Sequence, residues 1–148
     1  DIFDREKVFI DQNLDFICKE LPELKITLEH ITTKDATEYV HESNENLVAS
    51  ITPHHLALNR NAIFVGGIRP HNYCLPILKR EKHRRALIEV VTKGNKKFFL
   101  GTDTAPHFAS DKESYCDIEL EVTWTNLNPI EKDFSSETPQ SWITEFTK

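Results

Sequence analysis

Helical and extended patterns alternate along the first hundred residues, and this alternation constrains the fold more than any other feature. Apolar side chains recur near helical spacing in some segments and alternate with polar side chains in others. Helices that alternate with strands along a sequence are typical of parallel sheets joined by crossover helices. The sequence therefore predicts an α/β fold. Helices are expected at 4–20 and 79–93, and a short helix is expected to start at signals in 32–35 and to run to about 42. Strands are expected at 25–30, 48–52 and 97–100.

Residues 53–78 interrupt this alternation. They hold three prolines, the Gly66-Gly67 pair and three histidines, and they show neither helical nor strand periodicity. A loop of this length in a compact domain is usually either functional or disordered. The apolar and aromatic content of 53–78 favours a functional loop. Gly66-Gly67 lacks the spacing of a phosphate-binding loop.

The composition excludes several classes of protein. The 148 residues are long enough for one hydrophobic core, and the net charge of −6 argues against a general nucleic-acid binder. No apolar run approaches the ~20 residues that span a bilayer, and no secretory leader is recognisable, so a cytoplasmic protein is expected. Cys18, Cys74 and Cys116 are widely spaced, which excludes a zinc ribbon and favours reduced thiols.

The residue pattern changes after Cys116, and the chain is expected to divide into segments 1–116 and 117–148. Leu120, Val122 and Trp124 alternate with polar residues and predict one further strand. The remainder, rich in Asn, Pro, Ser, Thr and Glu, is expected to be loop.

Polar residues follow the expected strands at their carboxyl ends. His30, the His54-His55 pair and Asp103 occupy these positions, where parallel α/β folds gather their catalytic groups. Imidazole nitrogen and carboxylate oxygen suit a divalent metal such as zinc. A hydrogen-bonded histidine at position 30 and a turn-capping aspartate at position 103 are the structural alternatives.

Other candidates lie in the loops. His107, behind the stiffening Pro106, could donate to a substrate carboxylate or carbonyl, and Arg69 and His71 could bind an anion. An exposed loop histidine is the alternative for His107. A cluster of basic residues is expected to be a solvated helix face, not a nucleic-acid patch: Lys79, Arg80, Lys82, Arg84 and Arg85.

Five motifs in order resemble dihydroorotase, in the shorter bacterial type of this amidohydrolase family. The resemblance runs from residue 1 to about Cys116. The motifs are Leu28-Glu-His-Ile-Thr-Thr33, Ile51-Thr-Pro-His-His-Leu56, Val65-Gly-Gly-Ile-Arg-Pro-His71, Tyr73-Cys-Leu-Pro-Ile-Leu-Lys-Arg80 and Phe99-Leu-Gly-Thr-Asp-Thr-Ala-Pro-His107.

The resemblance implies part of a (β/α)8 TIM barrel with a two-zinc site that interconverts dihydroorotate and N-carbamoyl-L-aspartate. By position, His30 resembles a ligand of the second zinc. Asp103 resembles the ligand of the first zinc that also acts as general base. Leu75 resembles the residue whose backbone contacts the substrate ring, and His107 the residue that binds the substrate carboxylate.

The sequence departs from the family pattern in ways that leave a second reading open. The family's His-x-His motif does not occur here, and its bridging lysine and a further histidine belong to a region upstream of the match. An enzyme is therefore expected if the missing half of the barrel is present, with a homodimer as the expected assembly. The alternative is a catalytically incomplete fragment or pseudo-enzyme with a binding role. A related amidohydrolase acting on another cyclic amide is a weaker alternative, because the motifs around Leu75 and His107 match substrate-binding positions.

Overall fold

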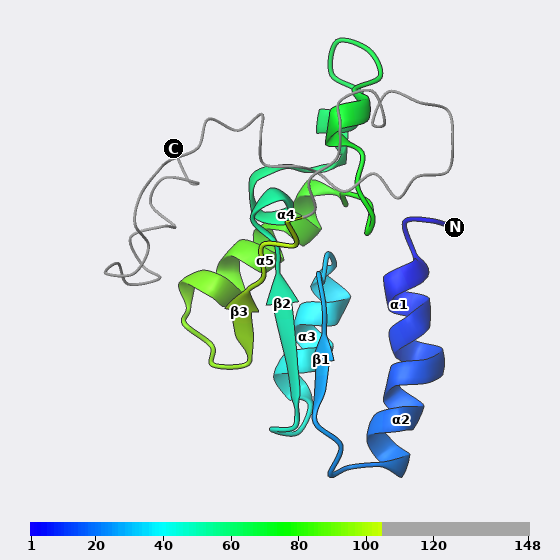
Figure 1. Cartoon of the computed structure of the whole chain (residues 1–148), viewed down its shortest axis with the longest axis vertical. Coiled ribbons are helices and arrows are strands. Elements are labelled where there is room, and N and C mark those ends of the chain that lie inside the picture. Colours follow the sequence, from blue (N-terminus) through cyan, green and yellow to red (C-terminus); the bar gives the residue numbers. More distant parts are fainter. Residues whose placement is uncertain (105–148) are drawn as a thin grey trace.

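The computed structural model describes residues 1–104, which form a three-stranded parallel sheet flanked by helices (Figure 1). The strands are β1 (Ile26–Leu28), β2 (Leu47–Ile51) and β3 (Phe98–Leu100), in the order β1-β2-β3. Ala49 pairs with Leu28 on one side and with Phe98 on the other. This arrangement confirms the predicted α/β class and its parallel strands.

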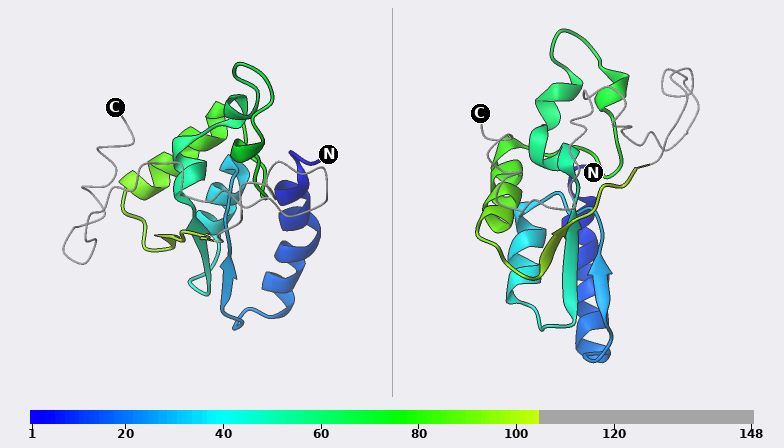
Figure 2. Two further views of the ribbon diagram at one scale, coloured as in Figure 1. Left: turned by 45° about the horizontal axis from the view of Figure 1, so that its top comes forward. Right: turned by 60° about the vertical axis from the view of Figure 1, so that its left-hand side comes forward.

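Two crossover helices cover one face of the sheet (Figure 2). Helix α3 (Lys34–Glu42) connects β1 to β2, and helix α5 (Glu81–Thr92) lies between β2 and β3 in the chain. The two helices contact each other, and each also contacts a strand. Leu87 of α5 is fully buried.

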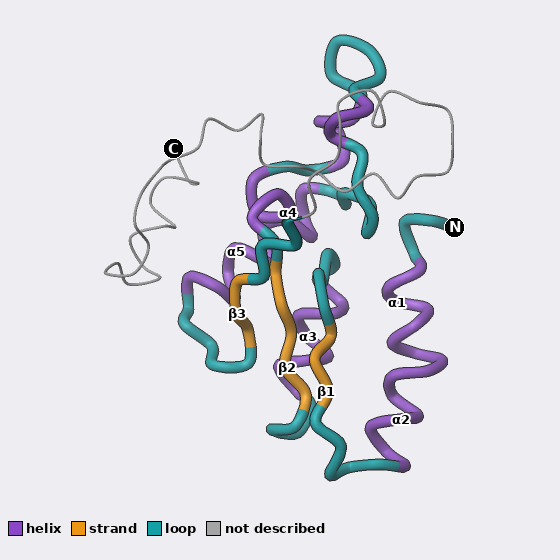
Figure 3. The backbone as a smooth tube through the Cα atoms, in the orientation of Figure 1, coloured by secondary structure: helices purple, strands orange, loops and turns teal. Residues whose placement is uncertain are grey.

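The first helix runs unbroken beside β1, as the tube in Figure 3 shows. It consists of α1 (Arg5–Phe9), a π-helical turn (Ile10–Leu14) and α2 (Asp15–Glu20), which confirms the helix expected at 4–20. Its core contacts come from Ile10 and Leu14, whereas Val8 is 45% and Phe16 63% exposed. The apolar residues occupy more than one side of this helix, so their spacing predicts the helix but not its buried face.

Residues 53–78 are more ordered than the sequence predicts. Helix α4 (Pro53–Ala57) begins directly after β2, and two 3₁₀ turns follow, η2 (Arg60–Ile63) and η3 (Pro70–Asn72). Thr52 caps α4, and Pro53 occupies its first turn. Five residues are too few to show a helical period, so only the Thr-Pro pair indicates this helix.

Two hydrophobic clusters stabilise the molecule. The larger lies between the sheet and the helices, and the smaller lies under the loop of residues 58–78. The larger cluster contains Ile10, Leu14, Ile31, Ala36, Val40, Leu47, Ala49, Ile51, Leu56 and Leu87, and the smaller contains Ile63, Cys74, Ile77 and Leu78.

Glu6 ties the first helix to the loop that follows β1. Its carboxylate accepts hydrogen bonds from the backbone N–H groups of Thr32 and Thr33, each at 2.8 Å, and from both hydroxyl groups. The Thr33 hydroxyl in turn accepts from the Ala36 N–H at 3.1 Å and caps α3. One carboxylate therefore fixes the position of α1 and the start of α3 together.

Lys97 caps the other end of α3 from within the core. Only 6% of this residue is exposed, and its ammonium group donates to the carbonyl groups of Val40 (3.1 Å), Ser43 and Asn44 (2.9 Å). The Val40 carbonyl lies in the last turn of the helix, where acceptors lack helical partners, and the other two carbonyls follow the end of the helix. The positive charge also faces the negative end of the helix dipole.

Several expectations fall outside the described residues, namely His107, Cys116, the strand at 119–125 and the segment 117–148. None of the helices in residues 1–104 is long and apolar enough to cross a membrane.

Candidate active site

His30 and Asp103 meet at the carboxyl edge of the sheet. The Nε2 atom of His30 lies 3.2 Å from Oδ1 of Asp103, and the two side chains are 27% and 24% exposed. His30 follows β1 and Asp103 follows β3, so the pair bridges the ends of the two outer strands. Both residues have left-handed backbone conformations, with φ of 52° and 49°. Such conformations in residues other than glycine cost energy and concentrate at functional sites.

Ser50 of the central strand positions His30. Its hydroxyl accepts a hydrogen bond from the His30 N–H at 3.0 Å, and its carbonyl accepts from the Ile31 N–H at 3.0 Å. These two bonds hold the turn in which the chain leaves β1. The backbone of His30 is therefore fixed relative to β2.

Gly101 allows the chain after β3 to place Asp103 near His30. Its N–H donates to the Ile51 carbonyl at 3.0 Å, which continues the sheet pairing beyond the strand. A Cβ atom at position 101 would lie 3.0 Å from the Ser50 Cβ and 3.3 Å from its Oγ. The absence of a side chain at Gly101 lets the chain pass close to Ser50 and carry Asp103 toward His30.

The donor atoms of this pair, an imidazole nitrogen and a carboxylate oxygen, are of the types that zinc accepts. Both side chains are partly open to solvent, so an ion can reach them. The structural alternative for His30, a hydrogen-bonded histidine with no metal, is consistent with the same contact.

A second group of side chains lies buried after β2. Thr52 Oγ1 is 3.2 Å from His54 Nε2 and 2.5 Å from His55 Nδ1, and His55 Nε2 is 2.8 Å from the Pro76 carbonyl. Cys74 Sγ donates to the same carbonyl at 3.4 Å. Burial, reinforced by neighbouring His54, lowers the pKa of His55 to about 3, so its ring is neutral.

His54, His55 and Cys74 could also hold a metal ion by residue type, because one ligand atom of each lies within 4.8 Å of the others. Both ring nitrogens of His55 already take part in hydrogen bonds to Thr52 and Pro76. A metal bound through His55 would displace one of these bonds. The hydrogen-bond network accounts for the burial of the group.

The remaining candidates lie in the loop between β2 and α5. Leu75 precedes Pro76 through a cis peptide bond, and its side chain is partly exposed. Arg69 is exposed, and its Nε donates to the Val65 carbonyl of its own loop at 2.6 Å, while His71 lies on η3. The anion-binding role expected for Arg69 and His71 stays a prediction.

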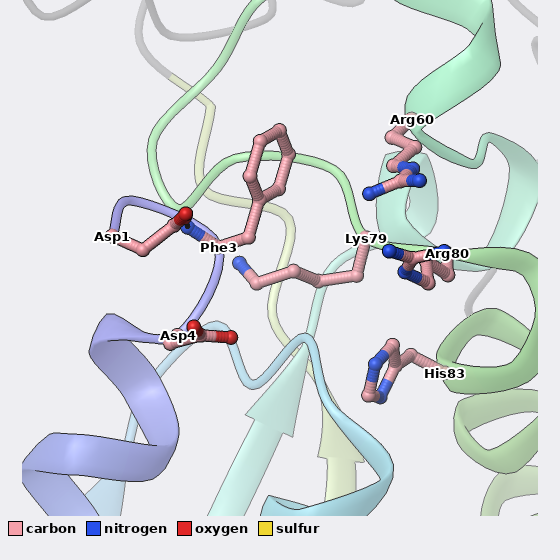
Figure 4. A pocket seen from close by; sticks show the side chains of 7 residues that line it. All are labelled: Asp1, Phe3, Asp4, Arg60, Lys79, Arg80 and His83. Atoms are coloured by element: carbon pink, nitrogen blue, oxygen red, sulfur yellow. Dashed lines mark hydrogen bonds between the residues drawn. The ribbon is translucent and has the colours of Figure 1, made fainter.

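A small polar hollow opens beside this loop (Figure 4). Its volume is about 210 Å³, and it is lined by Asp1, Phe3, Asp4, Arg60, Lys79, Arg80 and His83. The Lys79 side chain extends across it toward the N-terminal residues (Figure 4), and only 6% of that residue is exposed. The solvated face expected for the basic cluster is therefore wrong for Lys79, whose ammonium donates to the Ile77 carbonyl at 2.8 Å.

Sequence reasoning identified His30 and Asp103 but missed the residues that bring them together. The glycine that follows the Phe98–Leu100 strand was a signal of close backbone approach. Nothing in the sequence indicated Ser50, since its role depends on strand register.

Comparisons with known proteins agree with these features. No family model matches the chain. Over 116 residues, which are 78% of the chain, it is 64% identical to a dihydroorotase of a Picosynechococcus species and 62% identical to one of Vibrio vulnificus. It spans about a third (34%) of the length of these relatives.

Two solved structures are similar in fold. A dihydroorotase from Campylobacter jejuni matches with a TM-score of 0.69 and 40% identity, covering 72% of this chain and 31% of that one. A Saccharomyces cerevisiae dihydroorotase in complex with 5-fluoroorotic acid matches with a TM-score of 0.69 and 29% identity, covering 78% and 33%.

The parallel sheet and the polar pair at its carboxyl edge define the class as an α/β protein with a site where the strands end. Within that class, the chain is similar to dihydroorotases over 116 of its 148 residues. The resemblance carried by the five sequence motifs is confirmed.

Proposed function

We propose that the complete protein is a zinc-dependent dihydroorotase, a cyclic amide hydrolase that interconverts dihydroorotate and N-carbamoyl-L-aspartate in de novo pyrimidine synthesis. The observation that carries the proposal is the approach of His30 to Asp103 at 3.2 Å on the carboxyl edge of the sheet. The identity of the chain to dihydroorotases over 116 residues supports the same substrate.

His30 and Asp103 are the described residues that would hold zinc. Bound zinc would lower the pKa of a water molecule and polarise the carbonyl group under attack. Asp103 acts as the general base: its carboxylate takes the proton of the attacking water and delivers it to the ring nitrogen as the carbon–nitrogen bond breaks. The partial exposure of Asp103 leaves room for that water.

Substrate binding is assigned to two further residues. We propose that the Leu75 backbone contacts the ring of dihydroorotate and that His107 binds its carboxylate. His107 lies outside the described residues, so its assignment rests on the motif Gly101-Thr-Asp-Thr-Ala-Pro-His107. Leu75 is partly exposed and follows the buried Cys74, which supports its own assignment.

The wider architecture is part of the same proposal. Residues 1–116 would form part of a (β/α)8 barrel of the metal-dependent hydrolase type, with 117–148 as a separate C-terminal segment. The solved dihydroorotases with similar folds support this arrangement. A cytoplasmic homodimer that acts on a small molecule, with no nucleic acid or membrane as partner, completes the proposal.

The second candidate is a catalytically incomplete protein with a binding role. A two-zinc site of this family also needs a His-x-His pair and a bridging lysine, and the 148 residues contain no His-x-His sequence. The two candidates therefore differ in the number of metal ligands available.

Zinc content and turnover of the complete natural protein distinguish them. We expect about two zinc ions per subunit and interconversion of dihydroorotate and N-carbamoyl-L-aspartate. Absence of turnover in zinc-loaded protein would contradict the enzyme and leave the binding role.

A further inference from the structure

We propose that His55 is a positioning residue for substrate binding, which acts by holding the backbone of Leu75. The proposal rests on the function proposed above for Leu75. His55 itself lies in α4, after the central strand, and is 2% exposed. It would position the backbone next to Leu75 and would not contact the substrate itself.

The segment around Leu75 has no helix or strand to fix it. Between η3 and α5, residues 73–80 form no regular element, so their carbonyl groups need other partners. His55 Nε2 supplies one to Pro76 at 2.8 Å, and the ammonium group of Lys79 supplies one to Ile77 at 2.8 Å. Side-chain donors therefore hold two successive carbonyls directly after Leu75.

The direction of each hydrogen bond around His55 follows from its partners. A carbonyl only accepts, so Nε2 carries the proton and donates to Pro76. The neutral ring then has an unprotonated Nδ1, which accepts from the Thr52 hydroxyl at 2.5 Å. The Pro76 carbonyl thus determines the tautomer of His55, and the Thr52 hydroxyl holds the ring in place through Nδ1.

Burial separates the anchored residues from Leu75. Cys74, Ile77 and Leu78 are 1%, 6% and 0% exposed, whereas Leu75 is partly exposed. Cys74 also donates through Sγ to the Pro76 carbonyl at 3.4 Å. The chain is therefore held by hydrogen bonds directly after Leu75, and the buried Cys74 precedes it.

The metal ligands are held independently of this network. His30 depends on Ser50, and Asp103 follows Gly101, whereas His55 contacts Thr52, Cys74 and Pro76. Loss of the His55 bond to Pro76 should therefore weaken substrate binding more than the chemical step. Zinc content should not change.

A pair of amide variants in the complete protein isolates that bond. In His55→Gln the amide nitrogen can reach the position of Nε2, while in His55→Asn it reaches only the position of Nδ1. We expect His55→Asn to raise the KM for dihydroorotate about tenfold or more, with kcat within about threefold and zinc content unchanged. We expect His55→Gln to restore KM to within about threefold of the wild type.

His41→Gln is the matched control, because His41 is an exposed histidine near the far end of α3. A folded His55→Asn variant with the KM of the wild type would overturn the proposal, as would equal rises of KM in the Asn and Gln variants. If His55→Asn does not fold, Thr52→Val takes its place, since it removes the hydroxyl that holds the His55 ring through Nδ1. An unchanged KM in folded Thr52→Val would then count against His55. Absence of turnover in the wild type would instead contradict the proposed function.

Discussion

His30 and Asp103 adopt the same left-handed backbone conformation and bring their side chains within 3.2 Å of each other across the end of the central strand. Each follows an outer strand, and Ser50 of the central strand lies against both connections. Its hydroxyl accepts from the His30 N–H at 3.0 Å, and a Cβ at position 101 would lie 3.0 Å from its own Cβ.

Replacing the acid of this pair should abolish catalysis without unfolding the protein. For Asp103→Asn we expect turnover of dihydroorotate to fall by about 10³-fold or more, since the amide neither accepts the proton nor binds zinc as a carboxylate does. The thermal unfolding temperature of the metal-free protein should change little. Asp11→Asn, at an exposed ion pair with Lys7, is the control and should keep wild-type turnover. Near-normal turnover in Asp103→Asn would exclude Asp103 as ligand and base.

A methyl group on Gly101 should disturb the site through Ser50. The added Cβ would lie 3.0 Å from the Ser50 Cβ, so we expect Gly101→Ala to lower the free energy of unfolding by about 1–3 kcal/mol and to reduce turnover by displacing Asp103. Gly94→Ala is the control: its Cβ meets nothing within 4 Å, but its φ of 69° is strained for alanine. It should cost stability alone. Equilibrium denaturation measures the loss of stability, and kinetic assays measure turnover. Wild-type turnover in Gly101→Ala would contradict the predicted displacement of Asp103.

The buried ring of His55 should make stability depend on pH in the acid range. The pKa of His55 is lowered from 6.5 to about 3 by burial and by His54. Below pH 6.5 the unfolded chain binds a proton that the folded chain refuses until about pH 3, so protons favour unfolding across this window. We expect the free energy of unfolding of the metal-free protein to fall as the pH is lowered from about 6.5 toward 3.

The comparison with His55→Gln isolates this contribution, because glutamine does not titrate. Chemical denaturation at several pH values should give a shallower decline for the variant than for the wild type. Parallel curves for the two proteins would show that His55 ionises normally in the folded state.

Two adjacent lysines provide a test of the cap on α3. Lys97 is buried and donates to carbonyls at the end of the helix, so Lys97→Met should cost about 2–3 kcal/mol of unfolding free energy by leaving them without a donor. Lys96 pairs with Glu45 on the surface, and Lys96→Met should change stability by less than about 0.5 kcal/mol. Equal effects of the two substitutions in urea denaturation would contradict the capping role.

The sequence predicted the elements with a clear period and the residues at their ends. Alternation indicated the parallel sheet, and polar residues after strands indicated His30 and Asp103. The buried side of the first helix was missed because Val8 and Phe16 are as apolar as Ile10 and Leu14. Helix α4 was missed because five residues contain no full repeat.

The contacts that assemble the site were beyond sequence reasoning, because each depends on tertiary structure. Ser50 reaches the His30 N–H only in the observed register of β1 and β2. Lysine is usually a surface residue, and only the course of the loop buries the ammonium group of Lys79 next to Ile77. Local pattern carries no information on such pairs.

The four hydrogen bonds that Glu6 accepts from Thr32 and Thr33 join the first helix to the two threonines that follow His30 by only one residue. The position of the first helix and that of the turn after β1 therefore depend on the same carboxylate. A change in the packing of α1, whose Val8 and Phe9 are each 45% exposed, would reach the backbone next to His30 through these hydrogen bonds.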